Sequence, residues 1–553
     1  MKKKMRPVLT VLLLIVLVAI AGMGYLLIRK YMPTRQKMNL SEYYGEIAED
    51  QGIVIVGTEI LEARALVSGE MTEDTVYLPL DAVRSNLNQR FYWDSEGGQI
   101  LYATPSELLK VPAQQEAGGD VWQQGENIYL KLAYVHQYTD MDVTLLAEPN
   151  RIAIQKDFTD VNSVIATKNA YVRYRGGIKS LVLTKVSTGD RMTLLEELEN
   201  WYRVGTADGF VGYIDKKSVS DPEKVTVERE FQREEYQYLT MEEKVNLVWH
   251  QVTVKEANAG LADAIKDMTG VNVISPTWYY VTDNSGNIAD LSSADYVAAA
   301  HAAGLKVWGL IDNFTGEITT ETMLSSTSAR QNLISQLIAS ATNVGLDGIN
   351  VDFEQLSEGS GIHFLEFLRE LSIECHKNQL VLSVDNPVPA DFTSHYDRAE
   401  QGRVVDYIII MGYDEHYSGS VEAGSVASLP WVEQGIQDTL EEVPAERVIN
   451  AIPFYTRVWK TQAGTLSSEA VGMSRAAELV AENHAETYWD TNVLQTVASY
   501  ETAEASYKIW MEDQASIAEK VKLIPKYQLA GVAAWKLGLE DSSIWATITE
   551  NLS

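Results

Sequence analysis

The sequence predicts an α/β protein whose C-terminal part is a (β/α)8 barrel, preceded by a small β-barrel, an α+β domain and one N-terminal transmembrane helix. Three observations lead to this expectation. Apolar runs of strand length recur through the second half of the chain, short alternating runs fill the region before them, and a long uncharged apolar run lies near the N-terminus. At 553 residues the chain is also too long for a single domain.

The N-terminal apolar run covers residues 8–28 and carries no charge, so it is about long enough to cross a bilayer as a helix. A basic cluster precedes it, formed by Lys2, Lys3, Lys4 and Arg6. This asymmetry predicts a single-pass membrane protein with a cytoplasmic N-terminus and an extracellular C-terminal bulk. Residues 19–21 resemble a signal-peptidase site, but the apolar run continues past them and favours an uncleaved anchor. Residues 1–38 are therefore predicted to be a cytoplasmic tail and membrane anchor.

The charge distribution excludes a nucleic-acid-binding protein. The chain has 45 Lys and Arg against 77 Asp and Glu. Eight of those basic residues lie before residue 38, where no acidic residue occurs, so the remainder carries a net charge of about −40. Such an excess keeps an exported domain soluble, and it implies that contact with an anionic wall polymer depends on stacking and hydrogen bonds.

Residues 39–156 are predicted to form an α+β domain, in which short strands such as GIVIVG, TVYLPL and QILYAT surround one helix at 81–88. This stretch resembles the N-terminal stalk domain of copper amine oxidases, a module of many bacterial surface proteins. The resemblance implies no copper site here, because His136 is the only histidine in the stretch.

Residues 157–221 are predicted to form a small β-barrel from the segments NAYVRYRGG, GDRMTLLEE and NWYRVGTADGFVGYIDKKSV. They resemble a bacterial SH3 domain, with Trp201, Tyr202 and Tyr213 at the expected places. The resemblance implies a module that can bind cell-wall peptide. The alternative is that these aromatic side chains only form the core of the small barrel.

Residues 222–553 contain eight apolar runs bounded by turn or helix signals. Parallel barrel strands are buried on both faces and therefore read as near-continuous apolar runs, with catalytic residues at their C-terminal ends. Two intervening segments, 326–342 and 361–376, show the 3.6-residue period of helices. The eight predicted strands cover residues 247–252, 271–278, 305–311, 346–354, 380–384, 404–413, 447–454 and 529–535.

The fourth of these runs, LDGINVDFEQL at residues 346–356, carries the most chemistry. A strand sends alternate side chains to one face, so Asn350, Asp352 and Glu354 project together while apolar residues pack the other way. Two buried carboxylates cannot both ionise easily, so one keeps a raised pKa and can act as a general acid. Glu354, nearest the C-terminal end, is the better candidate. The alternatives are a solvated acidic edge or a metal-binding cluster, but no matching His or second acidic cluster follows.

The spacing D-x-x-N-x-D-x-E, formed by Asp347, Asn350, Asp352 and Glu354, resembles the signature of glycoside hydrolase family 18, the chitinase-like enzymes. Asn350 stands where a second Asp is common. Asn at this place also occurs in the branch of spore-germination and spore-cortex N-acetylglucosaminidases, so the departure points to that branch.

Three further segments extend the resemblance and imply contacts with the sugar. IIIMGYDEH matches the M-x-Y-D element of the family, so Tyr413 and Asp414 are expected at the substrate's N-acetyl group. AIPFYTRVW resembles the next family strand, and AAWKLG places an indole floor beneath the sugar. The substrate-binding residues implied in this way are Asp347, Asn350, Met411, Asp414, Tyr455, Arg457 and Trp535.

The resemblance implies a retaining, substrate-assisted hydrolase with three catalytic residues. Glu354 protonates the leaving oxygen, Asp352 orients the substrate's acetamide and stabilises the oxazolinium ion, and Tyr413 donates a hydrogen bond to the acetamide. The expected partner is peptidoglycan or a chitin-like polymer, cut at β-1,4 bonds after N-acetylglucosamine. No metal or organic cofactor is implied. Two other classes stay open, a non-catalytic glycan-binding protein and an envelope scaffold.

Overall fold

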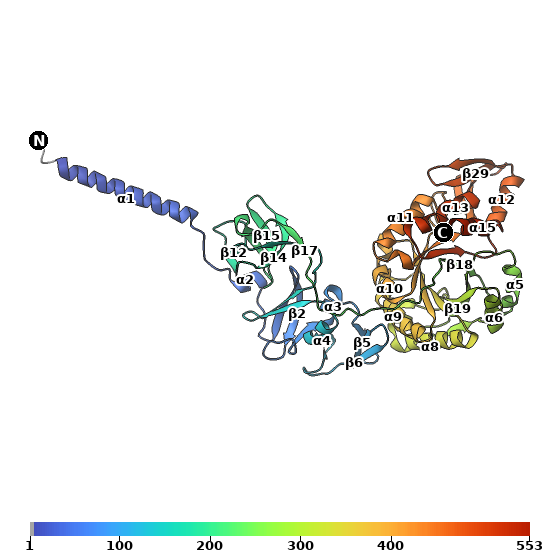
Figure 1. Cartoon of the computed structure of the whole chain (residues 1–553), viewed down its shortest axis with the longest axis horizontal. Helices are drawn as coiled ribbons and strands as arrows, with labels where there is room; N and C mark the ends of the chain where they lie inside the picture. Colours follow the sequence, from blue (N-terminus) through green and yellow to red (C-terminus); the bar gives the residue numbers. More distant parts are fainter. Residues whose placement is uncertain (1–4, 355, 553) are drawn as a thin grey trace. The chain divides into compact units, whose positions relative to one another are not determined.

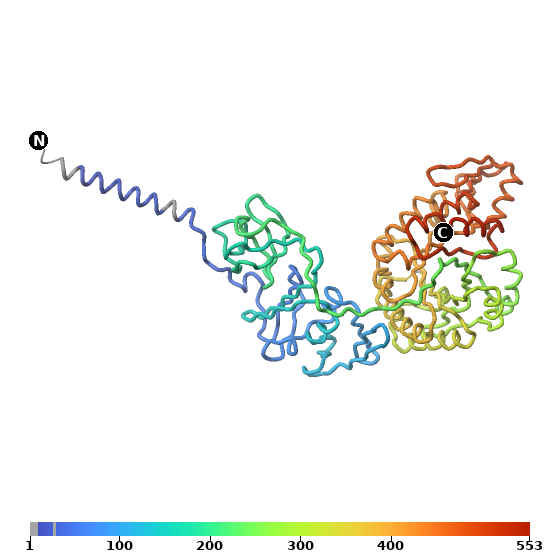
Figure 2. The backbone as a smooth tube through the Cα atoms, viewed as in Figure 1, coloured from blue at the N-terminus to red at the C-terminus, as the bar shows by residue number. Residues whose placement is uncertain are grey.

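The computed structural model describes residues 5–354 and 356–552 (Figure 1, Figure 2). The described chain divides into two compact units. One unit comprises the residues up to 93 together with 98–100 and 110–233, and the other comprises 94–97, 101–109 and the residues from 234 onward. The first unit contains two seven-stranded sheets and the second contains the barrel.

The N-terminal helix α1 (Met5–Tyr31) includes the predicted apolar run (Figure 1). Its segment Leu9–Tyr31 has 23 residues, and the mean hydropathy reaches 2.9 over a window of 18 residues within it, so by length and composition it can cross a membrane. Basic residues Arg29 and Lys30 lie in its last turn.

The first sheet has the strand order β7-β8-β3-β2-β1-β10-β9, with β1 parallel to β10 and antiparallel to β2. Helix α3 (Leu80–Asn86) corresponds to the predicted helix. A second helix, α4 (Leu132–Gln137), is too short for its period to be recognised in the sequence. The strands are β1 (Gln51–Val56), β2 (Glu59–Val67), β3 (Val76–Pro79), β7 (Val121–Gln124), β8 (Asn127–Lys131), β9 (Asp142–Leu146) and β10 (Arg151–Gln155). A separate three-stranded sheet contains β4 (Tyr92–Asp94), β5 (Gln99–Ala103) and β6 (Leu108–Pro112).

The second sheet curls into a small barrel with the order β13-β12-β16-β15-β14-β11-β17. It shares a hydrophobic core with the first sheet, because Tyr44 and Ile53 pack in one cluster with Val204 and Phe210. Tyr44, at the end of α2 (Leu40–Tyr44), also donates a hydrogen bond of 3.0 Å to the Gly209 carbonyl. The strands are β11 (Val161–Ile165), β12 (Ala170–Arg173), β13 (Val182–Val186), β14 (Arg191–Glu197), β15 (Trp201–Gly205), β16 (Val211–Asp215) and β17 (Glu223–Val225).

The second unit is a closed barrel of eight parallel strands, so the predicted fold class is confirmed. All eight predicted strands are present. They are β18 (Val245–His250), β19 (Val273–Val281), β21 (Lys306–Asp312), β22 (Gly348–Asp352), β23 (Val381–Pro387), β24 (Tyr407–Met411), β25 (Val448–Pro453) and β31 (Gly531–Trp535). A short strand, β20 (Ile288–Asp290), pairs antiparallel with β19 outside the barrel.

Alternate residues of the barrel strands form two cores. Inward-facing side chains such as Leu247, Trp308 and Ile409 fill the barrel, whereas Ile349 and Val351 pack outward against the helices. The helices predicted at 326–342 and 361–376 are α8 (Thr327–Val344) and α9 (Gly361–Lys377), which lie beside each other on the outside (Figure 1). The other helices of this unit include α6 (Ala294–Ala302), α7 (Thr320–Ser325), α10 (Arg398–Val404), α11 (Leu429–Leu440), α13 (Gln514–Val521), α14 (Leu523–Tyr527) and α15 (Ile544–Asn551).

Between β25 and β31 the chain forms an additional antiparallel sheet that the sequence does not predict. Its strand order is β27-β26-β30-β29-β28, and helix α12 (Met473–Glu482) packs against it. The strands are β26 (Tyr455–Gln462), β27 (Thr465–Gly472), β28 (Glu486–Asp490), β29 (Gln495–Glu501) and β30 (Ser506–Trp510). The first strand of this sheet starts two residues after β25 ends, so it is placed beside the C-terminal mouth of the barrel.

Candidate active site

A cavity of about 160 Å³ lies at the C-terminal ends of the barrel strands, where (β/α)8 enzymes carry their active sites. Seven of the ten predicted site residues line it. These are Asp352, Glu354, Met411, Tyr413, Asp414, Tyr455 and Trp535, joined by Trp249, Phe314 and Asp385.

Asp352 is the last residue of β22 and is only 6% exposed. Burial raises the pKa of its carboxyl well above the ordinary value, and the nearby Asp385, Glu354 and Asp312 add to the rise. Among the described residues its Oδ1 atom has no hydrogen-bond partner. An unpartnered buried oxygen in a cavity is suited to accept a hydrogen bond from a bound molecule.

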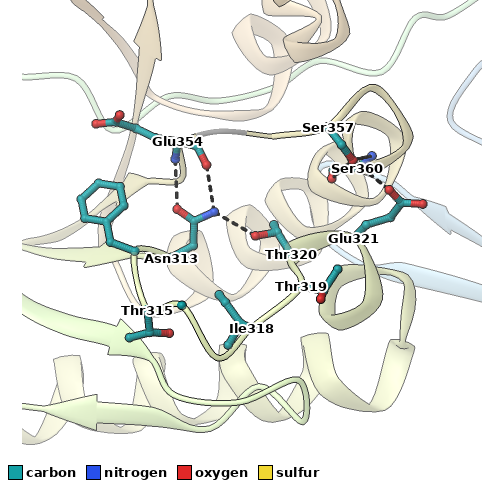
Figure 3. Close-up of a pocket in the computed structure, with 11 residues that line it drawn as sticks. Asn313, Thr315, Ile318, Thr319, Thr320, Glu321, Glu354, Ser357 and Ser360 are labelled. Atoms are coloured by element: carbon teal, nitrogen blue, oxygen red, sulfur yellow. Dashed lines mark hydrogen bonds between the residues drawn. The ribbon is translucent and has the colours of Figure 1, made fainter. Parts of the chain in front are cut away.

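Glu354 follows the end of β22 by two residues, and Asn313 fixes its backbone. The Glu354 amide donates to Asn313 Oδ1 at 3.1 Å, and Asn313 Nδ2 donates to the Glu354 carbonyl at 3.0 Å (Figure 3). Figure 3 shows the Glu354 carboxyl directed away from Asn313. Burial raises the pKa of this carboxyl, with further contributions from Asp414 and Asp312, so the side chain holds its proton at higher pH than a free glutamate does.

Asn350 does not line the cavity but lies buried beneath it. Its Nδ2 donates to Asp385 Oδ1 at 2.8 Å and to Ser383 Oγ at 3.0 Å, while its Oδ1 accepts from Trp249 Nε1 at 2.9 Å. The amide therefore serves as a donor to one carboxylate and an acceptor for an indole at the same time. A charged carboxylate at position 350 could not donate to Asp385.

Asp385 and Asp312 are site carboxylates that the sequence reasoning missed. Asp385 is fully buried on β23, and burial raises its pKa well above the ordinary value. Asp312 ends β21, stands in register with Asp352, and has a pKa raised by burial. The sequence feature that could have identified both residues is an acidic residue directly after a buried apolar run. The predicted strands at 305–311 and 380–384 stop one residue before Asp312 and Asp385, respectively.

Tyr413, Asp414 and Tyr455 form the opposite side of the cavity. Tyr455 Oη donates to Asp414 Oδ1 at 2.6 Å, and the rings of Tyr413 and Tyr455 lie 6.2 Å apart in an edge-to-face arrangement. Burial, followed by the charge of Asp352, raises the pKa of the Tyr413 hydroxyl well above its ordinary value. This hydroxyl consequently stays protonated and can donate a hydrogen bond.

Trp535 ends β31 and Trp249 belongs to β18, so two adjacent strands supply indole rings to the cavity. The two ring centres are 5.9 Å apart, with the planes inclined at 59°. Flat apolar rings of this kind can support the apolar face of a sugar ring.

Besides Asn350, two predicted substrate contacts, Asp347 and Arg457, do not line the cavity. Asp347 precedes β22 and so lies at the N-terminal end of the barrel, opposite the cavity. It accepts bonds of 2.8 Å from Lys306 Nζ and 2.7 Å from His301 Nε2. Arg457 lies on β26 outside the lining of the cavity, and its Nε donates to Ser468 Oγ at 2.9 Å. The prediction of Asp347 as a substrate contact is therefore wrong, whereas the contact of Arg457 with the substrate stays a prediction.

A larger pocket of about 690 Å³ adjoins the cavity and shares Glu354 and Phe314 with it (Figure 3). Phe314 is 53% exposed at this boundary. The remaining lining is mostly neutral and hydrogen-bonding, with one further carboxylate at Glu321 and no Lys or Arg. The lining residues are Asn313, Phe314, Thr315, Gly316, Ile318, Thr319, Thr320, Glu321, Glu354, Ser357 and Ser360.

A (β/α)8 barrel with a carboxyl of raised pKa, a second buried carboxyl and an aromatic floor at the strand ends is the arrangement of a glycosidase. The family described as "Glycosyl hydrolases family 18" matches residues 210–540, and the chain belongs to that family. The family described as "Bacterial SH3 domain" matches residues 168–220, within the second sheet of the first unit.

Known relatives match the barrel part of the chain. The uncharacterized glycosylase YvbX of Bacillus subtilis (strain 168) is 26% identical over 294 residues, which is 51% of this chain and 84% of that protein. The cortical fragment-lytic enzyme of the same organism is 26% identical over 240 residues, 42% of this chain and 56% of that enzyme. The crystal structure of the C-terminal domain of a putative chitinase from Desulfitobacterium hafniense DCB-2 has a TM-score of 0.52 at 24% identity. It covers 56% of this chain and 100% of that domain, and it shows the shared fold.

Proposed function

We propose that this protein is a membrane-anchored extracellular glycosidase that cleaves β-1,4 bonds on the reducing side of N-acetylglucosamine, by a retaining, substrate-assisted mechanism. The observation that carries the proposal is the meeting of Asp352, Glu354 and Tyr413 in one cavity above Trp535. A hydrolase with a protein nucleophile needs a second carboxylate free to attack carbon. Here the second carboxylate, Asp352, is almost completely buried, which suits it better to binding an amide.

In the first step an N-acetylglucosamine unit lies on Trp535 with its acetamide toward Asp352 and Tyr413. The unpartnered Oδ1 of Asp352 accepts the acetamide N–H, and the Tyr413 hydroxyl donates to the acetamide oxygen. Glu354 transfers its proton to the glycosidic oxygen. The acetamide oxygen attacks the anomeric carbon as the bond to the leaving sugar breaks, and an oxazolinium ion forms.

In the second step Glu354 is a carboxylate and takes a proton from a water molecule. The resulting hydroxide attacks the anomeric carbon, the bond to the acetamide oxygen breaks, and the product leaves with its β configuration. Glu354 has then regained its proton. The raised pKa of Glu354 favours the first step near neutral pH, because the group must start protonated.

The leaving sugar is assigned to the larger pocket beside Glu354. The glycosidic oxygen must lie within reach of the acid, so the sugar beyond it must enter space that also borders Glu354, as this pocket does. Its lining of Asn, Thr and Ser side chains suits sugar hydroxyl groups.

The cellular setting follows from the N-terminal half. Helix α1 would anchor the chain with its C-terminal bulk outside the cell, and the SH3-like domain would hold cell-wall peptide. Peptidoglycan is therefore the preferred substrate, and the relationship to a cortical fragment-lytic enzyme supports it. A chitin-like glycan offers the same N-acetylglucosamine unit to the cavity.

The stereochemistry of cleavage tests this mechanism. Proton NMR of chitooligosaccharide hydrolysis should show the β-anomer as the first product, with the α-anomer appearing only by mutarotation. A thiazoline analogue of the oxazolinium ion should inhibit competitively. An α-anomer formed first would overturn the retaining mechanism, and indifference to the thiazoline would overturn the participation of the acetamide.

A further inference from the structure

Glu354 lies just beyond the strand pairing that fixes the rest of β22. The register between β21 and β22 ends with Asp312 opposite Asp352, and Asp352 is the last residue of β22. On its other side β22 pairs with β23 only as far as Val351. The backbone that carries the acid is therefore not held by the barrel ladder.

The side chain of Asn313 takes the place of this strand pairing. Its Oδ1 accepts a bond of 3.1 Å from the Glu354 amide, and its Nδ2 donates to the Glu354 carbonyl at 3.0 Å (Figure 3). Nδ2 also donates to Thr320 Oγ1 at 3.0 Å. Only one orientation of the Asn313 amide makes all three bonds, because the reversed amide would set a donor against the Glu354 N–H. Asn313 is only 9% exposed, so water competes little for these bonds.

The direction of the Glu354 carboxyl depends on the position of its backbone. Within residues 5–354 and 356–552, neither a hydrogen bond nor an ion pair holds this carboxyl, and only burial and the charges of Asp414 and Asp312 act on it. The bonds to the main chain of residue 354 are therefore the polar contacts that fix where the acid begins.

The same amide links Glu354 to the wall of the larger pocket. Thr320 is the first residue of α7 and lines this pocket, to which the leaving sugar is assigned. The next residue, Glu321, accepts a bond of 2.8 Å from Ser357 Oγ, so α7 is also bonded to the segment that follows Glu354. The wall that receives the leaving sugar and the acid that protonates its oxygen are thus held together.

We propose that Asn313 is a positioning residue for the general acid, which keeps the Glu354 carboxyl within reach of the glycosidic oxygen. Without the two bonds from Asn313 the main chain of residue 354 can shift, and a displacement of about 1 Å can cost about 10² in rate. Only steps that use the proton of Glu354 would be slowed. This inference rests on the proposed function of Glu354 and states what that function requires.

The test compares two substrates that differ in their need for an acid, with the detergent-solubilised full chain as enzyme. A chitooligosaccharide must have its leaving oxygen protonated, whereas a dinitrophenyl glycoside of chitobiose releases a stable phenolate without a proton. In Asn313→Ala, kcat/KM should fall by about 10² for the chitooligosaccharide and much less for the dinitrophenyl glycoside. Glu354→Gln should show the same difference at least as strongly. Because kcat/KM reports the step in which the leaving group departs, the later role of Glu354 as a base does not enter.

Two further variants separate positioning from a general loss of stability. Asn313→Asp keeps the acceptor for the Glu354 amide, but as a carboxylate it cannot donate to the Glu354 carbonyl, so the difference should appear in weaker form. Asn258 is the matched control, since it is 8% exposed, donates to the Lys255 and Leu291 carbonyls at 3.0 and 2.7 Å, and lines neither cavity. Asn258→Ala should lower Tm and change kcat/KM by the same factor for both substrates.

The outcomes distinguish the inference from the function on which it rests. If Glu354→Gln lost the same factor on both substrates, the proposed acid and the inference would both be overturned. If Glu354→Gln showed the difference but both Asn313 variants affected the two substrates equally, or neither substrate, only the positioning role of Asn313 would be overturned.

Discussion

Replacing Asp312 by Asn should move the basic limb of the pH profile of the enzyme to lower pH. Burial, Asp414 and Asp312 raise the pKa of Glu354. An anion nearby disfavours ionisation of Glu354, so removing the Asp312 charge lowers that pKa. The acid then loses its proton, and the enzyme its activity, at a lower pH. The substitution keeps the local backbone, because an Asn oxygen can still accept the bond of 3.1 Å from the Phe314 amide.

The size of the shift follows from the barrel geometry. Asp312 stands in register with Asp352 on the adjacent strand, and Glu354 lies two residues further along. With strands about 4.8 Å apart and a rise of about 3.3 Å per residue, the charges are roughly 8 Å apart. At an effective dielectric constant of about 40 they interact by about 1 kcal/mol, a little under one pKa unit. Burial also raises the pKa of Asp312, which reduces the charge that Asp312 carries where the two groups titrate together, so the expected shift is about half a unit and less than one unit.

The assay is kcat/KM for unmodified chitooligosaccharides, followed by reducing-end release across the pH range. The Asp312→Asn profile should meet the parent profile on the acidic side and fall earlier on the basic side. Asp295→Asn removes the same charge from the first turn of α6, away from the cavity, and should leave the basic limb unchanged. A basic limb that stays in place or moves to higher pH in Asp312→Asn would refute the electrostatic reasoning.

Three further predictions concern neighbouring residues. Tyr413→Phe removes a protonated donor from the cavity, so kcat should fall by about 10² to 10³ with KM little changed. Steady-state kinetics measure both constants, and a higher KM with an unchanged kcat would contradict the prediction. In Asn350→Asp a protonated carboxyl can replace the amide donor to Asp385, so the variant should approach parental stability below about pH 4. As pH rises from the unfolded pKa of the new carboxyl to its folded pKa, the free energy of unfolding should fall. The fall should be about 1.4 kcal/mol for each unit by which burial raises the folded pKa above the unfolded one. Urea unfolding at several pH values measures this free energy, and a loss of stability that does not depend on pH would contradict the prediction. Burial alone would raise the pKa of Asp347, but bonds from Lys306, the Val307 amide and His301 outweigh it and lower that pKa. The stabilisation by the ionised Asp347 exists above the unfolded pKa of about 3.9 and is lost as pH falls through the folded pKa. Asp347→Asn should therefore lower Tm at neutral pH and lower it less in acid. KM should be unchanged. A rise in KM would restore Asp347 to the substrate site.

The barrel was predictable because its strands are buried on both faces. Runs such as 305–311 and 404–413 are apolar apart from Lys306 and Asp406, and each became a strand within a few residues of the expected ends. The acidic motif was predictable for a related reason, since Asp352 ends a wholly buried strand and Glu354 follows it two residues later.

The missed features lack such a local pattern. Asp312 and Asp385 are single acidic residues at the ends of apolar runs, and only the pairing of β21 and β23 with β22 brings them to Asp352. In the additional sheet, β28 is exposed along nearly its whole length, so its sequence shows no alternation between buried and exposed residues. The role of Asp347 was misjudged because the motif groups it with residues that lie at the other end of the same strand.

The central claim is that Glu354 is the acid that cleaves a glycan containing N-acetylglucosamine. The most direct measurement incubates the full chain and its Glu354→Gln variant with purified peptidoglycan and with chitin oligomers, and analyses the products by reducing-end assay and mass spectrometry. The parent should release fragments that end in reducing N-acetylglucosamine, and the variant should be slower by about 10² or more while still binding the glycan. Equal release by both proteins would contradict the assignment of Glu354. If neither protein released fragments while both bound the glycan, the protein would be a glycan-binding protein and not an enzyme.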